Sequence, residues 1–559
     1  MSPTNNLDTA GDTPLHDACK DQSMVSAALV LVPLDLGADP AARNFNGETP
    51  MHCVSATAHS EIVQILQRRG ADVDARNTCG ETPLHTAVHR GNFAGKEVVH
   101  TLVDAGANVH ARDNNGRTPL HLVCGRKEST LLSLLDRGAD INACDFCLNT
   151  PLHVQAGRGG HGVGGHTLFL LSKGADVHAK NNTGKTPLHI STKNGRVTLT
   201  KILLDAGARP DTRSHGGIGS VIVAAAHNRP RLVPILSKFG GNVDAADNIG
   251  QTPLHYAAFK GLGAVAAALL RAGANPFLRT HRGRSALDIA VVYGRNALVG
   301  QMTDVTNPHL DLDLNKHLAR GDNLGQTPLH HACRNSSALA IAKLLLGAGA
   351  DPTTRDNCDM SPLDVAVVHG NVFTVNLLLI ESGMDVQDAD RQGWTALHYS
   401  AKKGFLEVSR ALMDAGADAS ARNANQVSPL DVAVGEGHTR LVADMVGKHG
   451  ADATLVDTNG FTALHLAETR DMVDVLVAAG ADVNARNHEG NTPLMYQMLE
   501  PPLVAALLHH GALVNTQNET GQTVLHMAVR DGREQTTIEI VDMLLRAGAD
   551  ETLLDCDGY

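Results

Sequence analysis

The residues of this sequence that could carry chemistry are, first of all, its thirty histidines and nine cysteines. Cys144 and Cys147 form a Cys-x-x-Cys motif, a spacing that suits a zinc site or a redox-active pair. A structural zinc site needs four ligands, and neither a second such motif nor a histidine pair lies near this one in the sequence. Cys79 is a weak candidate for a third ligand. We therefore predict no metal site.

A glycine-rich stretch from Gly157 to Gly162 has a superficial likeness to a phosphate-binding loop. It follows a predicted helix and lacks the Gly-Lys-Ser/Thr ending, so we interpret it as a flexible turn. His161 and His166 flank these glycines, and we identify no partner ligands for them. The sequence has no Gly-x-Ser-x-Gly elbow, kinase motif set or zinc-protease helix. We expect no catalytic residue, no cofactor and no enzymatic activity.

Most of the remaining chemistry is accounted for by one repeated tetrapeptide, which reads Thr82-Pro83-Leu84-His85 in its intact form. It occurs sixteen times, 30 to 42 residues apart, with its first residue at Thr13, Thr49, Thr82, Thr118, Thr150, Thr186, Ser220, Thr252, Ser285, Thr327, Ser361, Thr395, Ser428, Thr462, Thr492 and Thr523. Histidine occupies the fourth position in eleven copies, at His16, His52, His85, His121, His153, His189, His255, His330, His398, His465 and His526. Aspartate takes this position in three others, at Asp288, Asp364 and Asp431.

A period near 33 residues with this tetrapeptide resembles the ankyrin-repeat family over about residues 5–559. The resemblance implies an all-α repeat solenoid, in which stacked helix-turn-helix repeats with β-hairpin fingers form a curved superhelix. It also implies that fingers and first helices line a concave face. The histidines of the motif are then expected to bridge neighbouring repeats by hydrogen bonds, which makes them structural.

The repeat from Asn77 onward illustrates the local signals. Thr82 suits a helix N-cap and Pro83 the first helical position, where a missing N–H costs nothing. Apolar residues at helical spacing predict two helices, separated at Gly91. Gly106 suits the left-handed residue that ends the second helix. The same glycine occurs in fifteen of the sixteen repeats, at Gly37, Gly70, Gly106, Gly138, Gly174, Gly207, Gly240, Gly273, Gly349, Gly383, Gly416, Gly450, Gly480, Gly511 and Gly548.

The irregular repeats set the expected organisation of the chain. The repeat at Ser285 lacks the closing glycine and is followed by the longest spacing, which we assign to a joint, a contact element or a tolerated insertion. Pro230 and Pro234 predict bending or weak stability near a second helix. We divide the chain into a lead-in (1–12), a first block of repeats (13–305) with an irregular repeat near 220–250, a loop insertion (306–320), a second block (321–554) and the start of an incomplete finger (555–559).

Composition and charge exclude several other functions. The net charge of −12 is spread along the chain without a basic block, which disfavours nucleic-acid binding. No apolar run is long enough to span a membrane, so we expect no direct membrane insertion. An odd number of cysteines without framework spacing indicates a reducing compartment. We expect a cytoplasmic monomer, with a nuclear location left open.

Surface chemistry near the middle of the chain is the remaining candidate for function. Solvent-facing positions of the concave side are mostly polar, but here several are apolar, aromatic or basic, the types enriched at interface hot spots. The candidate partner-binding residues are Ile249, Phe259, Lys260, Val292, Tyr293, Met360, Trp394, Lys402 and Lys403. The competing interpretation is that the aromatic rings pack between repeats.

We consider two main functions. The first is a non-catalytic scaffold or adaptor that binds protein partners of unknown identity on the concave face, with the net charge favouring a basic or mixed partner surface. The second is the targeting arm of a larger enzyme, ubiquitin ligase or channel. A third hypothesis, also drawn from the family resemblance, is hydroxylation of asparagines by an iron-dependent dioxygenase, and it concerns Asn142, Asn484 and Asn515.

Overall fold

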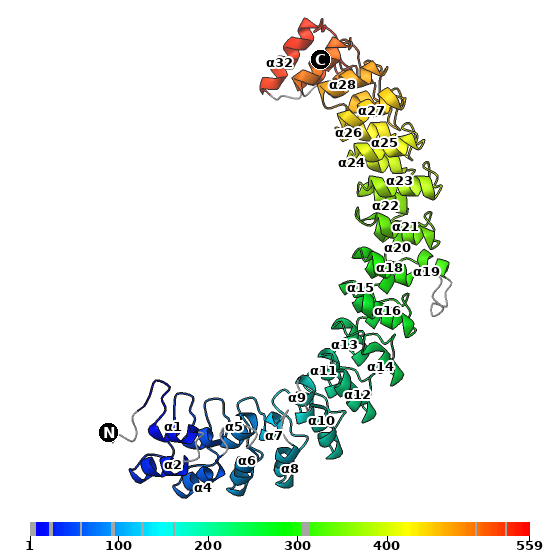
Figure 1. The fold of residues 1–559 in the computed structure, drawn as a ribbon. Helices are drawn as coiled ribbons and strands as arrows, with labels where there is room; N and C mark the ends of the chain where they lie inside the picture. The colour runs from blue at the N-terminus through cyan, green and yellow to red at the C-terminus, as the bar shows by residue number, and fades with distance from the viewer. Residues whose placement is uncertain are drawn as a thin grey trace. The chain divides into compact units, whose positions relative to one another are not determined.

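Pairs of short helices, each preceded by a finger-like loop, make up the chain in the computed structural model (Figure 1). The structure describes residues 7–21, 26–55, 59–90, 95–123, 128–159, 163–304, 314–497, 500–530 and 534–558. Two compact units divide the chain, an N-terminal half (Met1–His281) and a C-terminal half (Arg282–Tyr559). The division lies earlier in the chain than the insertion expected at 306–320.

Eight helix pairs form the N-terminal half. The first helices are α1 (Pro14–Lys20), α3 (Pro50–Ser55), α5 (Pro83–Arg90), α7 (Pro119–Leu122), α9 (Pro151–Gly157), α11 (Pro187–Lys193), α13 (Ser220–Ala226) and α15 (Pro253–Lys260). The second helices are α2 (Ser26–Asp35), α4 (Ser60–Arg68), α6 (Gly95–Asp104), α8 (Glu128–Asp136), α10 (Val163–Ser172), α12 (Val197–Asp205), α14 (Val233–Lys238) and α16 (Gly263–Arg271). Each first helix starts at the repeated motif, as the sequence predicts.

Eight further pairs form the C-terminal half. The first helices are α17 (Ala286–Val292), α20 (Pro328–Cys333), α22 (Pro362–Val368), α24 (Ala396–Lys403), α26 (Pro429–Gly435), the 3-10 helix η2 (Ala463–Leu466), α29 (Pro493–Tyr496) and α31 (Val524–Arg530). The second helices are α18 (Asn296–Met302), α21 (Leu339–Gly347), α23 (Val372–Glu381), α25 (Leu406–Asp414), α27 (Thr439–Lys448), α28 (Arg470–Ala478), α30 (Pro501–His509) and α32 (Glu534–Arg546). One extra helix, α19 (Leu314–Ala319), follows α18.

Within each half, first helices pack on first helices and second helices on second helices. The core is a layer of Leu, Val and Ala between them, such as Leu84, Val99 and Leu102, which are at most 1% exposed. Burial of apolar surface contributes about 25 cal/mol per Å² to stability, which makes these layers its main source. Because each repeat contacts only its neighbours, the core extends along the stack.

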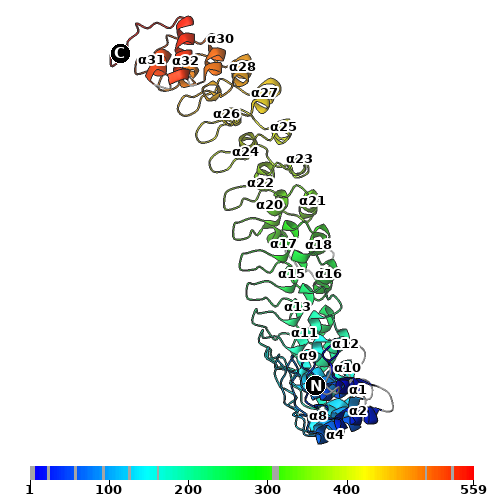
Figure 2. The same cartoon turned by 90° about the vertical axis from the view of Figure 1, so that its left-hand side faces the viewer.

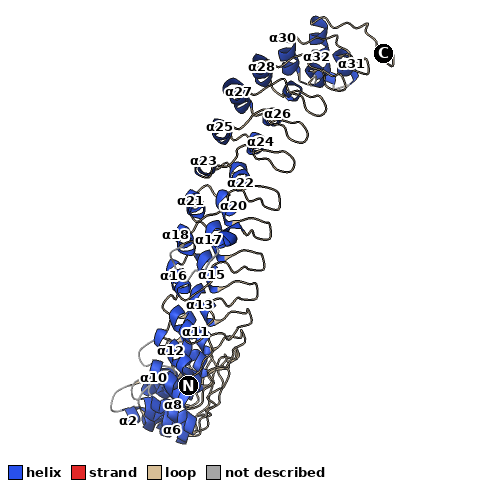
Figure 3. Ribbon diagram, turned by 90° about the vertical axis from the view of Figure 1, so that its right-hand side faces the viewer, coloured by secondary structure: helices blue, strands red, loops and turns tan. Residues whose placement is uncertain are grey.

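The fingers are loops that project from one side of the helices (Figure 2). Each is closed by backbone bonds such as Asn77 N–H to the Glu81 carbonyl, at 2.9 Å. Among the described residues they contain no extended strands (Figure 3). Isolated antiparallel bridges occur, as at Ala389–Thr395 and Val456–Thr462. The expected hairpins are therefore tight turns, too short for a continuous strand ladder.

The motif histidine links the start of its own helix to the next repeat. In the repeat of His85, Nδ1 accepts the Thr82 backbone N–H at 3.1 Å, and Nε2 lies 3.0 Å from the Arg117 carbonyl oxygen of the following finger. Since Nδ1 accepts a hydrogen, the proton of the neutral ring is on Nε2, which donates to that carbonyl. Nine motif histidines make the same inter-repeat bond at 2.9–3.1 Å, which confirms their structural role: His16, His52, His85, His121, His153, His189, His330, His398 and His465.

The closing glycine is required for its backbone conformation. All fifteen predicted positions have a positive φ, between 61° and 96°. At Gly106, φ is 91° and an added Cβ would meet nothing within 4 Å. Space is therefore available, and the left-handed backbone alone selects glycine.

The structure differs from the sequence in two details of the irregular repeats, while bending or weak stability near Pro230 and Pro234 stays a prediction. Pro234 is in the first turn of α14 and Pro230 precedes that helix, so neither proline removes an internal helical hydrogen bond. In the expected loop 306–320, residues 314–319 form α19, because Leu314 and Leu318 lie one turn apart and are both buried. Residues 306–313 lie outside the described part of the chain.

Replacing His85 by Ala should lower the free energy of unfolding by about 1–3 kcal/mol, because two hydrogen-bonded backbone groups in the buried junction lose their partner. Urea denaturation followed by circular dichroism measures the change. The matched control is His110→Ala, since His110 is exposed, and its effect should stay within about 0.5 kcal/mol. Equal losses in the two variants would contradict the bridging role.

Stability should also fall on mild acidification. Burial lowers the pKa of His52, His85, His121, His153, His189, His330, His398 and His465 below the ordinary value of 6.5. The unfolded chain therefore binds more protons below pH 6.5, so the stability that these rings contribute is present above this pH and is lost as the pH falls. Burial raises the pKa of Asp364 to about 6, and that of Asp431 in the same direction, which has the opposite effect below about pH 6.

The urea midpoint should therefore be lower at pH 5.5 than at pH 7.5, since the histidines outnumber the two carboxyl groups. A midpoint that stays constant or rises over this interval would show that the buried rings do not titrate as described.

Candidate protein-binding surface

We define the finger face as the surface that the fingers and the first helices form in each half of the molecule. The nine predicted partner-binding residues all come from fingers or the ends of first helices, but they are divided between the two halves. The N-terminal half contains Ile249, Phe259 and Lys260. The C-terminal half contains Val292, Tyr293, Met360, Trp394, Lys402 and Lys403.

In the N-terminal half, all three residues are exposed. Ile249 in the finger is 58% exposed and Phe259 near the end of α15 is 49% exposed. The Lys260 ammonium donates to the Ala226 carbonyl of the preceding repeat at 2.5 Å. Lys260 thus has a structural contact as well as an exposed position.

In the C-terminal half, Tyr293 follows α17 directly and is 48% exposed, whereas Val292 is partly covered. Met360 and Trp394 come just before the capping residues Ser361 and Thr395, and both are partly covered. Lys402 and Lys403, in the last turn of α24, are exposed.

Trp394 is the centre of an aromatic cluster. Its ring centroid lies 5.5 Å from that of His398 and 5.3 Å from that of Tyr399, both in a tilted arrangement. The Lys402 ammonium lies 5.5 Å from the centre of the indole ring, within the range of a cation–π interaction. The indole is therefore held in place by neighbours from its own repeat while part of it faces solvent.

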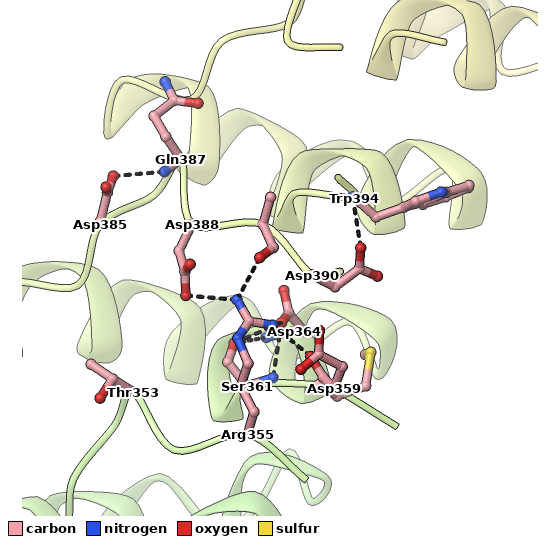
Figure 4. A network of polar contacts seen from close by, with 12 residues as sticks. Thr353, Arg355, Asp359, Ser361, Asp364, Asp385, Gln387, Asp388, Asp390 and Trp394 are labelled. Atoms are coloured by element: carbon pink, nitrogen blue, oxygen red, sulfur yellow. Dashed lines mark hydrogen bonds and ion pairs between the residues drawn. The ribbon is translucent and has the colours of Figure 1, made fainter. Parts of the chain in front are cut away.

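Asp390 supports this cluster from the finger. Its carboxylate accepts the Trp394 backbone N–H at 2.8 Å (Figure 4). The same carboxylate accepts the Tyr399 hydroxyl at 2.6 Å. Burial and this bond raise the pKa of Tyr399, so the phenol stays neutral and keeps donating. The arrangement fixes both aromatic side chains before any partner arrives.

Arg355 connects this finger to the preceding one. Its guanidinium donates to the Asp359 carbonyl of its own finger, to the Ala389 carbonyl at 3.0 Å and to the Asp388 carboxylate at 2.7 Å (Figure 4). The same group lies 3.7 Å from Asp364, the residue that replaces the motif histidine.

Asp364 caps its helix through Ser361, whose N–H and hydroxyl donate to the carboxylate at 2.9 and 2.7 Å. Burial raises the pKa of Asp364 to about 6, while the Ser361 bonds and the Arg355 charge oppose that shift. The buried carboxylate therefore depends on these partners to remain ionised at neutral pH.

Three further residues of the candidate surface are absent from the predicted set. Phe461 occupies the same position as Trp394, directly before the capping residue, and Val427 has this position in the repeat between them. Phe461 contacts Tyr496 of the next repeat edge-on, with centroids 4.9 Å apart, and Tyr496 is 49% exposed. The available signal was the shared position within the repeat.

The motifs first considered for chemistry lie apart from this cluster. Cys144 is partly covered and Cys147 is exposed, both on one finger of the N-terminal half. Gly157 ends α9 and His166 is buried in α10. His161 lies outside the described residues.

Fold and surface together define a class of protein, a stacked helix-pair repeat protein with a row of finger loops. A family model for ankyrin repeats matches residues 2–77, 54–145, 126–214, 221–308, 272–356, 302–390, 329–423, 363–457, 430–518 and 469–555. The chain belongs to the ankyrin-repeat family.

Curated relatives match parts of the chain. It is 26% identical over 351 residues to the E3 ubiquitin-protein ligase KEG of Arabidopsis thaliana, covering 59% of this chain and 20% of that protein. It is 30% identical over 238 residues to the B-cell lymphoma 3 protein homolog of Mus musculus, covering 42% and 50%. It is 31% identical over 239 residues to the palmitoyltransferase ZDHHC13 of Mus musculus, covering 41% and 36%. The chain thus spans at most half the length of these relatives.

Replacing Arg355 by Met should lower the free energy of unfolding by about 1–3 kcal/mol, because two carbonyls and a carboxylate lose a charged donor. It should also raise the pKa of Asp364 further. Urea denaturation measures the stability, and its pH dependence near pH 6 reports the carboxyl.

The matched control is Arg391→Met in the neighbouring finger. The Arg391 side chain is 87% exposed and forms one ion pair, 3.5 Å from Asp359, so its loss should cost less than about 1 kcal/mol. If Arg391→Met costs as much as Arg355→Met, the link between the fingers is not what stabilises this region.

Proposed function

We propose that this protein is a non-catalytic scaffold that binds partner proteins on the finger face of its ankyrin repeats. The observation that carries the proposal is the Trp394 cluster, where an indole and a phenol are held in place at the surface beside the exposed Lys402 and Lys403. Aromatic and cationic residues of this kind dominate binding energy at protein interfaces. Side chains that are already ordered lose little entropy when a partner binds.

The distribution of the reactive residue types supports a non-catalytic role. Nine of the motif histidines, the most numerous candidates for acid–base chemistry, are buried and bonded between repeats, as at His85 and His330. Family membership supports protein binding. Two of the relatives have enzyme names, but the similarity covers only 20% and 36% of their lengths, so it does not favour an enzyme-arm function for this chain.

Cellular location, oligomeric state and class of partner are further parts of the proposal. Within the described part of the chain, no helix has the length and apolar character needed to cross a lipid bilayer. We place the protein in the cytoplasm, with the nucleus as the alternative, and as a monomer that binds protein segments rather than nucleic acid. Size-exclusion chromatography with light scattering tests the monomer directly.

The test of the main proposal is affinity capture from native lysate with the full chain. A triple variant, Phe259→Ala, Tyr293→Ala and Trp394→Ala, should lose at least one partner that the wild type retains. The control is Phe373→Ala with Ile380→Ala on α23, because these side chains are 70% and 80% exposed but belong to a second helix. Circular dichroism and the urea midpoint establish that each variant is folded.

Two results would count against this surface. One is the same set of captured partners for wild type and triple variant. The other is a loss of partners in the α23 control alone, which would move the interface to the second helices.

A further inference from the structure

One position of the repeat changes character within the C-terminal half. The residue directly before the capping Thr or Ser is polar, charged or glycine in every repeat of the N-terminal half, namely Asp12, Glu48, Glu81, Arg117, Asn149, Lys185, Gly219 and Gln251. In four consecutive repeats of the C-terminal half it is apolar, at Met360, Trp394, Val427 and Phe461. We call these four residues the apolar row.

The backbone of the apolar row is fully used by the fold. Each residue donates its N–H to the Asp or Asn of its finger, at 2.8 Å for Trp394 and 2.9 Å for Phe461. The Met360 and Val427 carbonyls accept the inter-repeat bonds of His330 and His398, at 3.0 and 3.1 Å. The side chains differ in role: Asn149 and Gln326 bond the next finger at this position, whereas Val427 and Phe461 have no polar side-chain group to do so.

The two aromatic members rest on rigid supports. Trp394 and Phe461 each lie 5.5 Å, centroid to centroid, from the motif histidine of their own repeat. All four side chains of the row are partly covered, unlike the strongly exposed Phe373. The row thus presents partly covered apolar side chains, which a thin partner backbone can approach more closely than a helix about 10–12 Å wide.

The distance between packed first helices sets the spacing of the apolar row. First helices of consecutive repeats pack on one another, α22 on α24, α24 on α26, and α26 on η2, at a spacing of roughly 8–10 Å. A chain in the extended polyproline II conformation advances about 3.1 Å per residue with three residues per turn, so one turn spans one repeat and every third side chain faces the same way. A partner in this conformation would place every third side chain on a member of the row.

Local charge differs from the net charge of the molecule. Lys402 and Lys403 are exposed beside Trp394, and among the described residues neither forms an ion pair. The nearby carboxylates are already bonded, Asp390 to Trp394 and Tyr399, and Asp388 to Arg355. In the next repeat Glu436 is the exposed charge at the position of Lys403, so the positive region is confined to the Trp394 end.

We propose that the apolar row binds an extended segment of a partner protein with apolar side chains at every third position and carboxylates over Lys402 and Lys403. This inference rests on the proposed scaffold function and names the chemistry of its partner. It differs from the expectation of a basic or mixed partner surface, because beside Trp394 the carboxylates Asp388 and Asp390 are bonded and Lys402 and Lys403 are exposed.

Trp394 is the only tryptophan in the protein, so its fluorescence reports directly on this site. The probes are two synthetic twelve-residue peptides with Leu or Phe at every third position and either Glu or Lys between them. The Glu peptide should shift the emission of the full-length protein in a saturable, salt-sensitive way, and the Lys peptide should not. A third peptide, which is acidic and helix-forming with apolar residues seven apart, tests whether the partner segment binds as a helix.

The variant Lys402→Gln with Lys403→Gln should weaken the Glu peptide about three- to tenfold, as expected for two exposed ion pairs. The matched control is Lys201→Gln with Lys343→Gln, two exposed lysines on second helices, which should leave the affinity unchanged.

Stronger binding of the Lys peptide or of the helical peptide, or no effect of the Lys402 and Lys403 variant, would overturn the inference. If captured partners depend on Trp394 while the Glu peptide fails to bind, the scaffold function stands and only the partner chemistry is wrong. If neither experiment gives a signal that depends on Trp394, both proposals fail.

Discussion

The hydrogen bonds of the motif histidine are the interaction on which the rest of the structure depends. One ring nitrogen satisfies the first backbone N–H of its own helix, and the other donates to the carbonyl at the base of the next finger. A helix start and a contact between repeats are therefore set by one side chain. Because a lone repeat cannot bury its apolar face, this link joins local structure to the stacked core. The link also requires a neutral imidazole ring, and folding therefore buries titratable groups along the stack in their uncharged form.

Much of the fold could be predicted because its signals are local. The motif, the Pro at the first helical position and the closing glycine each act through the backbone of one residue, and the structure places them as expected. Where the sequence was misleading, the deciding facts were non-local. Pro234 removes no internal helical hydrogen bond because the helix starts just before it, and Leu318 forms part of a helix because a buried surface receives it. Neither fact is visible in residue types alone.

The binding surface was only partly predictable for a similar reason. Exposure at Ile249, Phe259 and Tyr293 follows from position in the repeat, but the sequence does not show that Lys260 contacts a backbone carbonyl. Nor does it show that Phe461 and Tyr496 from different repeats meet. The apolar row is identified by comparing the same position across consecutive repeats. A search for single unusual residues does not identify it.

The residue before the helix cap has a constant backbone role and a variable side chain. Its N–H and carbonyl belong to the hydrogen bonds that hold finger and stack together, as at Val427. In other repeats its side chain also links neighbouring fingers, as Asn149 does through Asn181 and Gln326 through Asp356. Val427 and Phe461 have no side-chain group for such a bond. Four consecutive repeats therefore present apolar side chains where others form polar links, and on this ground we propose a role in recognition for the row.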